Sequence, residues 1–140
     1  MNSSKRYKKS ELINFTYNIL KKVGLNNSNS KIISNLIIRA DERGVWSHGI
    51  VRLPVYVNRI EKKAAKKNPN FKFKKISNNI FHLSGDNGLG YLAANAGIKK
   101  CVSLAKEKGI GLVAISKSNH FGMAANYLEF ASKNKCIAWV

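Results

Sequence analysis

The amino-acid sequence predicts an α/β fold, with a helical N-terminal region at residues 1–69 and an alternating strand and helix domain at residues 70–140. Apolar residues recur at helical spacing through the first region, which indicates helices that bury one face. Strand-like runs then alternate with helical runs, which is typical of α/β domains. The last run of the 140 residues reads as a core strand with no turn after it, so we expect an incomplete piece of a longer protein.

Two helices are expected first, over residues 10–23 and from about 28 to 43. Ser10 can cap the first helix, and Asn27 or Ser28 can cap the second. A glycine follows each helix, where it favours an end. Their apolar stripes are Leu12, Phe15, Ile19 and Val23, then Ile32, Ile33, Leu36 and Ile37.

A third helix is expected to begin near Ser47. At about 100° per residue, His48, Arg52 and Arg59 share one face of it. Pro54 should bend this helix or delay its regular part, because proline removes a donor and crowds the preceding turn. The opposite, apolar face carries Ile50, Leu53, Val57, Ile60 and Ala64.

A basic connector leads from this helix into the α/β region. The expected order there is a strand hairpin, a glycine-rich turn, a long helix, a buried strand, a loop, a helix and a final buried strand. The ranges of the more clearly bounded elements are 71–76, 80–83, 84–90, 112–115, 116–122 and 136–140.

Composition narrows the class of protein. The net charge of +18 comes mainly from dispersed lysines, which favours a solvated surface over a nucleic-acid or membrane partner. Cys101 and Cys136 form no zinc-binding pattern, so no metal is expected and a reducing cytoplasm is the default location. The sequence has no run long and apolar enough for a signal peptide or membrane span.

The polar face of the third helix is the first candidate site. His48 and Arg52, four residues apart, should project together, with the Ser47 hydroxyl at the same end. An imidazole exchanges a proton near neutral pH, and a guanidinium binds a carboxylate through two hydrogen bonds. The pattern therefore suits a small carboxylate substrate, although a solvated polar face with a capping serine explains the same spacing.

Two further motifs are less specific. His120 lies in a loop after a strand, where α/β sheets carry site residues, but Ser118 or Asn119 can instead cap the next helix. The GDNGLG turn has its glycines in the order GxxGxG, not the GxGxxG of a dinucleotide fingerprint. It is interpreted as a tight turn that uses the positive φ open to glycine. His82 reads as a structural strand residue.

Together, three stretches resemble the malate/L-lactate dehydrogenase family, which includes ureidoglycolate dehydrogenase, diketogulonate reductase and sulfolactate dehydrogenase. They occur in the family's order and at about its spacing, and the similarity extends from about residue 10 to residue 140. The stretches are DERGVWSHGIVRLPVYVNRI (41–60), DNGLG (86–90) and SKSNHFGMAANY (116–127).

The resemblance implies an oxidoreductase that uses NAD or NADP to interconvert a small 2-hydroxy acid and its 2-oxo acid. It implies a nucleotide fold that is not of the Rossmann type, a homodimer when complete, and no nucleic-acid or membrane partner. It leaves open whether His48 or His120 transfers the proton. By motif, it assigns the catalytic residues His48 and His120, the substrate residues Ser47, Arg52 and Asn119, and the cofactor contacts His120 and Gly122.

Two departures qualify this expectation. Many members have a second basic residue directly after the proline, where this chain has Val55, so carboxylate binding would depend on Arg52 alone. Members are also more than twice as long, and much of their nucleotide-binding surface would lie beyond Val140. The alternatives are a non-catalytic truncated remnant or half of a split enzyme, and a small basic nucleic-acid-binding module motivated by the charge.

Overall fold

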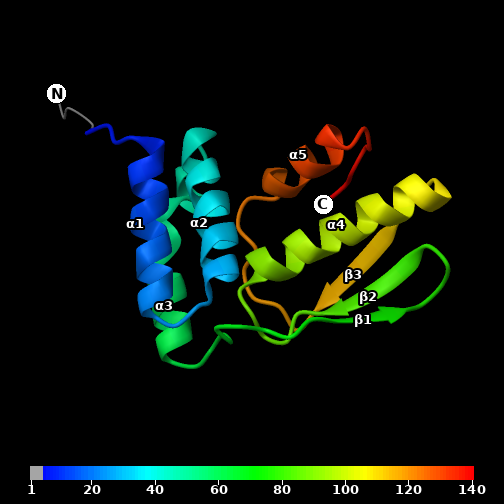
Figure 1. Ribbon diagram of the computed structural model, residues 1–140, viewed down its shortest axis with the longest axis horizontal. Helices are drawn as coiled ribbons and strands as arrows, with labels where there is room; N and C mark the ends of the chain where they lie inside the picture. Colours follow the sequence, from blue (N-terminus) through cyan, green and yellow to red (C-terminus); the bar gives the residue numbers. More distant parts are fainter. Residues whose placement is uncertain (1–4) are drawn as a thin grey trace.

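Three helices pack side by side at one end of the molecule in the computed structural model, which describes residues 5–140 (Figure 1). They are α1 (Lys9–Lys22), α2 (Asn27–Glu42) and α3 (Leu53–Glu61). The first two confirm the predicted helices, but their caps differ. Lys8 precedes α1, and the side chain of Asn26 caps α2 by accepting a 2.8 Å hydrogen bond from the Asn29 amide.

The predicted third helix does not begin at Ser47. Two short 3-10 turns, η1 (Trp46–His48) and η2 (Ile50–Arg52), come first, and Gly49 between them is extended, with φ −88° and ψ −150°. Regular α-helix starts only at Leu53, with Pro54 in its first turn, where the missing N–H costs nothing. The proline therefore delays the helix, as predicted.

A three-stranded sheet lies beside the helices, in the order β1 (Lys72–Lys75), β2 (Ile80–Ser84), β3 (Leu112–Ser116). The β1–β2 pair is antiparallel and confirms the predicted hairpin. The β2–β3 pair is parallel, and α4 (Gly90–Lys108) connects its strands across one face of the sheet (Figure 1). The carboxyl ends of β2 and β3 therefore lie together, next to the helices.

Two predictions about the later elements are wrong. β3 is not buried, since Leu112 is 51% and Ile115 39% exposed. Residues 136–140 form no strand, and Ile137 and Trp139 are fully exposed. The apolar runs were recognised, but burial also needs a neighbouring surface, and within residues 5–140 none covers these side chains. Helix α5 (Ala125–Lys133) packs beside α4.

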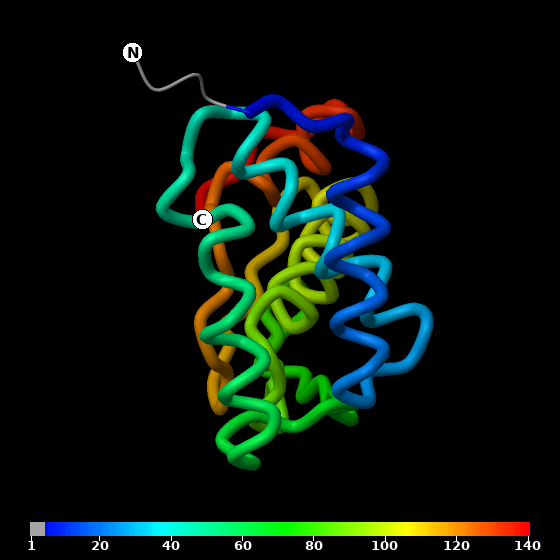
Figure 2. Tube along the Cα trace, turned by 90° about the vertical axis from the view of Figure 1, so that its left-hand side faces the viewer, coloured from blue at the N-terminus to red at the C-terminus, as the bar shows by residue number. Residues whose placement is uncertain are grey.

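The largest core cluster joins the helical and α/β parts. It includes Leu20, Ile37 and Ile60 from the helices and Leu89 and Leu92 from the start of α4. Figure 2, which views the helical end, shows α4 running back behind the three helices. The packing therefore continues across residue 69, and the division into two domains there stays a prediction.

Within the described residues, no helix combines the length and the apolar character needed to cross a lipid bilayer.

Candidate active site

The two candidate histidines come together at the junction of the helices and the sheet. The rings of His48, from η1, and His120, from the loop after β3, are stacked with centroids 5.5 Å apart and planes at 27°. One ring comes from each of the two predicted regions. The sequence predicted both as site residues, and the fold brings their rings together, while their roles stay predictions.

Asp41 shapes the segment that carries His48. Its Oδ2 accepts a 2.8 Å hydrogen bond from the Ile50 amide, which ties the end of α2 to the turns before α3. A Cβ at Gly49 would overlap the Asp41 carboxylate, so the close approach requires glycine there. Burial raises the pKa of Asp41, and the Ile50 N–H opposes that rise. This contact places His48 without a continuous helix.

Ser47, His48 and Arg52 are brought together, although not by helical spacing. The Ser47 hydroxyl lies 3.0 Å from His48 Nδ1. The Arg52 side chain folds back, and its Nε donates a 2.8 Å hydrogen bond to the Ser47 carbonyl. Because this bond uses Nε, it leaves the Nη1–Nη2 edge for a carboxylate.

His120 is held by Gly122, which the resemblance assigned to a cofactor contact, and by two tyrosines that sequence reasoning did not assign to the site. Its Nδ1 lies 3.0 Å from the Tyr56 hydroxyl and accepts a 3.2 Å hydrogen bond from the Gly122 amide. The Tyr56 hydroxyl is in turn 3.0 Å from that of Tyr91. The available signal was the position of Tyr56, one helical turn after Arg52, but an aromatic residue at core spacing is ordinarily just a core residue.

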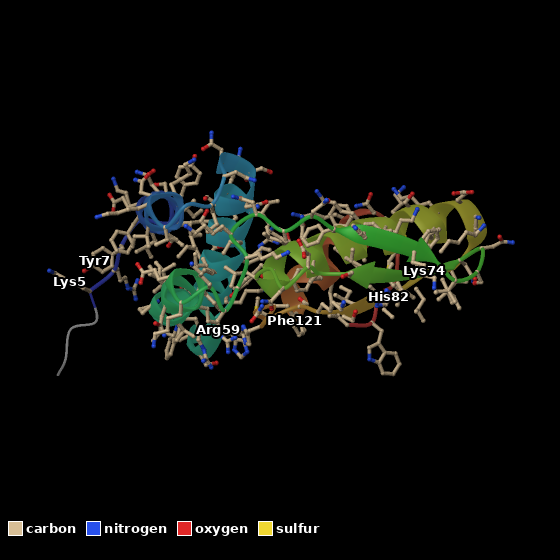
Figure 3. The ribbon with its side chains drawn as sticks, turned by 90° about the horizontal axis from the view of Figure 1, so that it is seen from below. Lys5, Tyr7, Arg59, Lys74, His82 and Phe121 are labelled. Atoms are coloured by element: carbon tan, nitrogen blue, oxygen red, sulfur yellow. The ribbon has the colours of Figure 1, made fainter. Side chains whose placement is uncertain are left out.

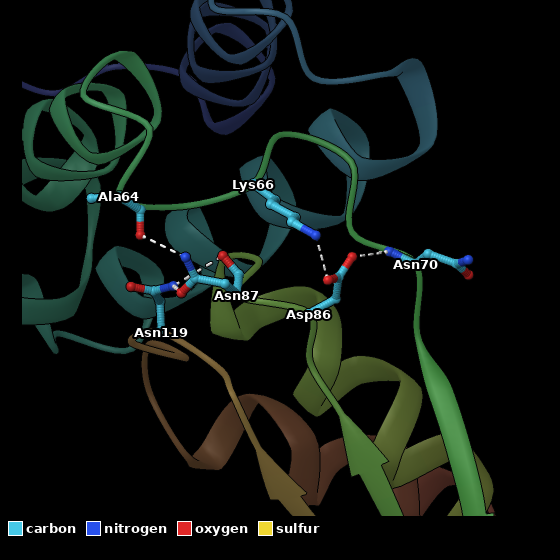
Figure 4. Close-up of polar contacts among 6 residues, drawn as sticks. All are labelled: Ala64, Lys66, Asn70, Asp86, Asn87 and Asn119. Atoms are coloured by element: carbon cyan, nitrogen blue, oxygen red, sulfur yellow. Dashed lines mark hydrogen bonds and ion pairs between the residues drawn. The ribbon is translucent and has the colours of Figure 1, made fainter.

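Asn119 forms the centre of a hydrogen-bond network behind the histidines. Its Oδ1 accepts a 2.8 Å bond from Arg59, and its Nδ2 contacts the Gly88 carbonyl and both oxygens of Asn87. Figure 4 shows Asn87 linked onward to the Ala64 carbonyl. The Asn119 carboxamide is thus already occupied at both ends by protein groups.

The glycine-rich turn does not place its glycines at positive φ, contrary to the interpretation of the sequence. The residues with positive φ are Asp86 (48°) and Asn87 (55°), while Gly85, Gly88 and Gly90 do not have positive φ. Asp and Asn tolerate this conformation better than other non-glycine residues. A Cβ at Gly90 would overlap the Asn119 carbonyl. The glycines are therefore needed for close packing rather than for backbone rotation.

Asp86 anchors the same turn from the outside. Its carboxylate accepts a 2.5 Å bond from Lys66 Nζ and a 3.0 Å bond from the Asn70 amide (Figure 4). The contact with Lys66, followed by the Asn70 N–H, lowers the pKa of Asp86.

Ser118 and Asn119 cap no helix, because α5 begins only at Ala125.

The site is strongly cationic. Burial lowers the pKa of His120, and the charges of His48, Arg52 and Arg59 lower it further. Figure 3 shows Arg59 and Phe121 near the helix–sheet junction, with His82 farther out on the sheet. There, His82 Nε2 lies 2.8 Å from Ser116 Oγ on the neighbouring strand, which fits its reading as a structural strand residue.

The described residues fit the substrate end of a hydride-transfer site better than a dinucleotide cradle. The Cβ space at Gly90 and Gly122 is filled by Asn119 and by the Tyr91 ring, so neither glycine is open to a pyrophosphate on that side. His120 is an exposed residue, and its contact with a nicotinamide stays a prediction. A cofactor contact at Gly122 stays a prediction.

Comparison with known proteins gives one family. The model of the malate/L-lactate dehydrogenase family matches residues 7–140. Malate/(S)-sulfolactate dehydrogenase of Methanothermus fervidus is 37% identical over 85% of this chain and 35% of its own length. Malate dehydrogenase of Pyrococcus abyssi is 34% identical over 94% of this chain and 36% of its own length. The chain spans little more than a third of these curated relatives.

Solved structures agree. Malate dehydrogenase from Pyrococcus horikoshii superposes with a TM-score of 0.90 at 32% identity, over 92% of this chain and 37% of that one. Sulfolactate dehydrogenase from Methanocaldococcus jannaschii gives 0.87 at 32% identity, over 90% and 37%. Because the family model covers nearly the whole chain and the fold agrees, this chain belongs to the malate/L-lactate dehydrogenase family.

Proposed function

We propose that this chain carries the substrate-binding and proton-transfer part of an oxidoreductase that interconverts a 2-hydroxy acid and its 2-oxo acid. The observation that supports it most is the His48–His120 stack, with the Arg52 guanidinium bound beside it to Ser47. Proton exchange and carboxylate binding are the two tasks that the protein must perform in this reaction. The names of the relatives, malate and sulfolactate dehydrogenases, agree with an acidic substrate.

Arg52 is the proposed carboxylate anchor. Its Nη1–Nη2 edge can form two parallel hydrogen bonds with a carboxylate, while the Nε bond to Ser47 holds the side chain in place. Ser47 would add a hydroxyl contact to the substrate. Asn119 would shape the substrate site through the loop that it holds, since its own carboxamide is occupied.

The two imidazoles face the reacting oxygen in this proposal. When a 2-oxo acid is reduced, negative charge develops on its carbonyl oxygen, and an imidazole N–H stabilises that charge and can supply the proton. The mutual repulsion of stacked imidazolium ions favours one charge at a time, consistent with the lowered pKa of His120.

NAD or NADP is the proposed redox partner, which supplies or accepts the hydride when bound. One relative is named as an NAD(+) enzyme and another as an NADP(+) enzyme. His120 and Gly122 are the proposed contacts of this chain with the nicotinamide end. We also propose that the complete protein is a homodimer that acts in the cytoplasm, which sizing and fractionation of the native protein would test.

The test is titration of the 140-residue chain with L-malate, followed through the histidine ring signals in NMR spectra, with and without NADH or NADPH. Saturable shifts of His48 and His120, without a shift of His82, are expected. The uncharged dimethyl ester of malate is the control ligand. No shift in any combination, or equal shifts with the ester, would overturn the proposal.

The remnant alternative is tested separately with the same chain. Oxidation of NADH or NADPH in the presence of oxaloacetate, abolished by His48→Ala, would refute a non-catalytic remnant.

A further inference from the structure

Two buried tyrosines connect to His120 through hydrogen bonds. Tyr56 on α3 is 1% exposed, and Tyr91 on α4 is fully buried, with its ring edge-on to that of Tyr56 at 5.4 Å. A buried hydroxyl needs a hydrogen-bond partner. Here the Tyr56 hydroxyl lies 3.0 Å from both Tyr91 Oη and His120 Nδ1, so the three groups form one chain of hydrogen bonds.

The Gly122 amide fixes the direction of this chain. A backbone N–H can only donate, and it lies 3.2 Å from His120 Nδ1, so Nδ1 must be an acceptor without a proton. The proton of neutral His120 is then on Nε2. For the same reason the Tyr56 hydroxyl must donate to Nδ1 and accept from the hydroxyl of Tyr91.

Local packing keeps the Gly122 amide in this position. Gly122 has φ +78°, and a Cβ there would overlap the ring of Tyr91. Tyr91 thus serves the site twice, since its ring supports Gly122 and its hydroxyl donates to Tyr56. Burial raises the pKa of both tyrosines, so their hydroxyls stay protonated donors.

His48 has a different kind of neighbour. Its Nδ1 lies 3.0 Å from the Ser47 hydroxyl, which can donate to an imidazole or accept from an imidazolium by rotating. The surroundings of His48 therefore tolerate both protonation states. Those of His120 do not, because its Nδ1 is between two donors.

We propose that Tyr56 is a positioning residue that, with Tyr91 and the Gly122 amide, holds His120 as the neutral Nε2–H tautomer. This inference rests on the proposed function and gives the two histidines different roles in its proton transfer. His120 donates a hydrogen bond to the substrate oxygen and keeps its proton. In reduction, the N–H bond of the His48 imidazolium breaks as the O–H bond of the hydroxy acid forms, with the balancing hydride taken from NADH or NADPH.

The charged groups around His120 also favour its neutral form. Burial and the neighbouring positive charges lower its pKa, which disfavours an imidazolium. None of the groups that shift the pKa of His120 is a carboxylate. The groups that face it from the other elements are His48, Arg52, Tyr56, Arg59 and Tyr91.

The decisive experiment is long-range proton–nitrogen NMR of the chain labelled with nitrogen-15 in its histidine rings. This spectrum distinguishes the two tautomers and the imidazolium, and substituting His82 and His48 one at a time assigns the three signals. We expect His120 to show Nε2–H and to protonate at a lower pH than the ordinary histidine pKa of 6.5. An Nδ1–H tautomer of His120, or protonation of His120 at or above the ordinary pKa of 6.5, would overturn the inference.

Variants separate the role of Tyr56 from general packing. Tyr56→Phe should raise the pKa of His120 and reduce its Nε2–H population. Tyr91→Phe removes the hydroxyl that donates to Tyr56 but keeps the Tyr91 ring, and it should have the same effect more weakly. Tyr91→Phe also serves if Tyr56→Phe does not fold. Tyr17→Phe is the control, because it removes a tyrosine hydroxyl that is bonded to Asn27 Oδ1 between α1 and α2, and it should leave the His120 tautomer unchanged.

An effect of Tyr17→Phe equal to that of Tyr56→Phe would reduce Tyr56 to a packing residue and overturn its role. Because the tautomer is read without substrate, this result is independent of the malate titration. A chain that binds no acid can still show the Nε2–H tautomer, and a chain that binds malate can still lack it.

Discussion

Arg59 donates a 2.8 Å hydrogen bond to the carboxamide oxygen of Asn119, and this contact ties α3 to the loop that carries His120. His48 lies on the segment that leads into α3, so the bond joins the supports of both histidines. The alignment of the two rings therefore depends on a residue that touches neither substrate nor cofactor in our proposal.

Loss of the Asn119 side chain should loosen this connection. Asn119→Ala should lower the free energy of unfolding by about 1–3 kcal/mol, because it leaves partly buried carbonyl and guanidinium groups without partners. Urea unfolding measures the change. Asn78→Ala, in the exposed hairpin turn, is the control and should have little effect. Equal stability of both variants would show that the network contributes nothing to stability.

Two glycines with similar backbone angles should respond differently to alanine. Gly44 has φ +72° and no atom within 4 Å of a new Cβ, whereas at Gly122, with φ +78°, the Cβ meets Tyr91. Gly44→Ala should destabilise by about 1–2 kcal/mol through backbone strain alone. Gly122→Ala should lose roughly 1–3 kcal/mol more through the overlap. Thermal and urea unfolding measure both, and matching losses would contradict the packing described for Gly122.

Asp86 should make stability depend on pH in a defined direction. Its pKa is lowered in the folded chain, so its stabilising contribution is present above its ordinary value of 3.8 and is lost as the pH falls through the folded value. Asp86→Asn should therefore be less stable than the parent chain at neutral pH, and the difference should shrink in acid. A difference that stays constant with pH would mean that its charge is unimportant.

Arg52 should control affinity for the acid rather than folding. Arg52→Ala should raise the dissociation constant of L-malate roughly 10- to 100-fold, because a charge-assisted hydrogen bond contributes about 1.5–3 kcal/mol. Calorimetric titration measures the affinity. Arg6→Ala is the charge-matched control and should bind as the parent chain does. If both variants lose affinity equally, general charge and not an anchor explains the binding.

The sequence predicted what local spacing determines. The helices α1 and α2 and the hairpin of β1 and β2 appear at the expected places, although Phe15 of the predicted α1 stripe is 55% exposed. It failed where the outcome depends on a distant segment. The helix expected to begin near Ser47 starts only at Leu53, since Gly49 packs against Asp41 and Pro54 delays the regular part, and the exposure of Leu112 depends on what covers it.

The candidate site shows the same division. His48, Arg52 and His120 were predicted as site residues because of the chemistry of their side chains and their motifs. Tyr56 and Tyr91 were missed because a tyrosine at core spacing is ordinarily just core, and only the fold shows that their hydroxyls reach His120 Nδ1. A hydrogen-bond chain between α3, α4 and a loop leaves no periodic trace in the sequence.

The cationic surroundings of the histidine pair have a consequence for the kinetics of encounter. Arg52 and Arg59 stand within a chain whose net charge is +18, so a dianionic acid meets an attractive field well before it touches the site. Salt shortens the reach of that field, to a Debye length of about 8 Å at physiological ionic strength. Capture of a small acid by this site is thus expected to slow as salt is added, while the bound geometry stays the same.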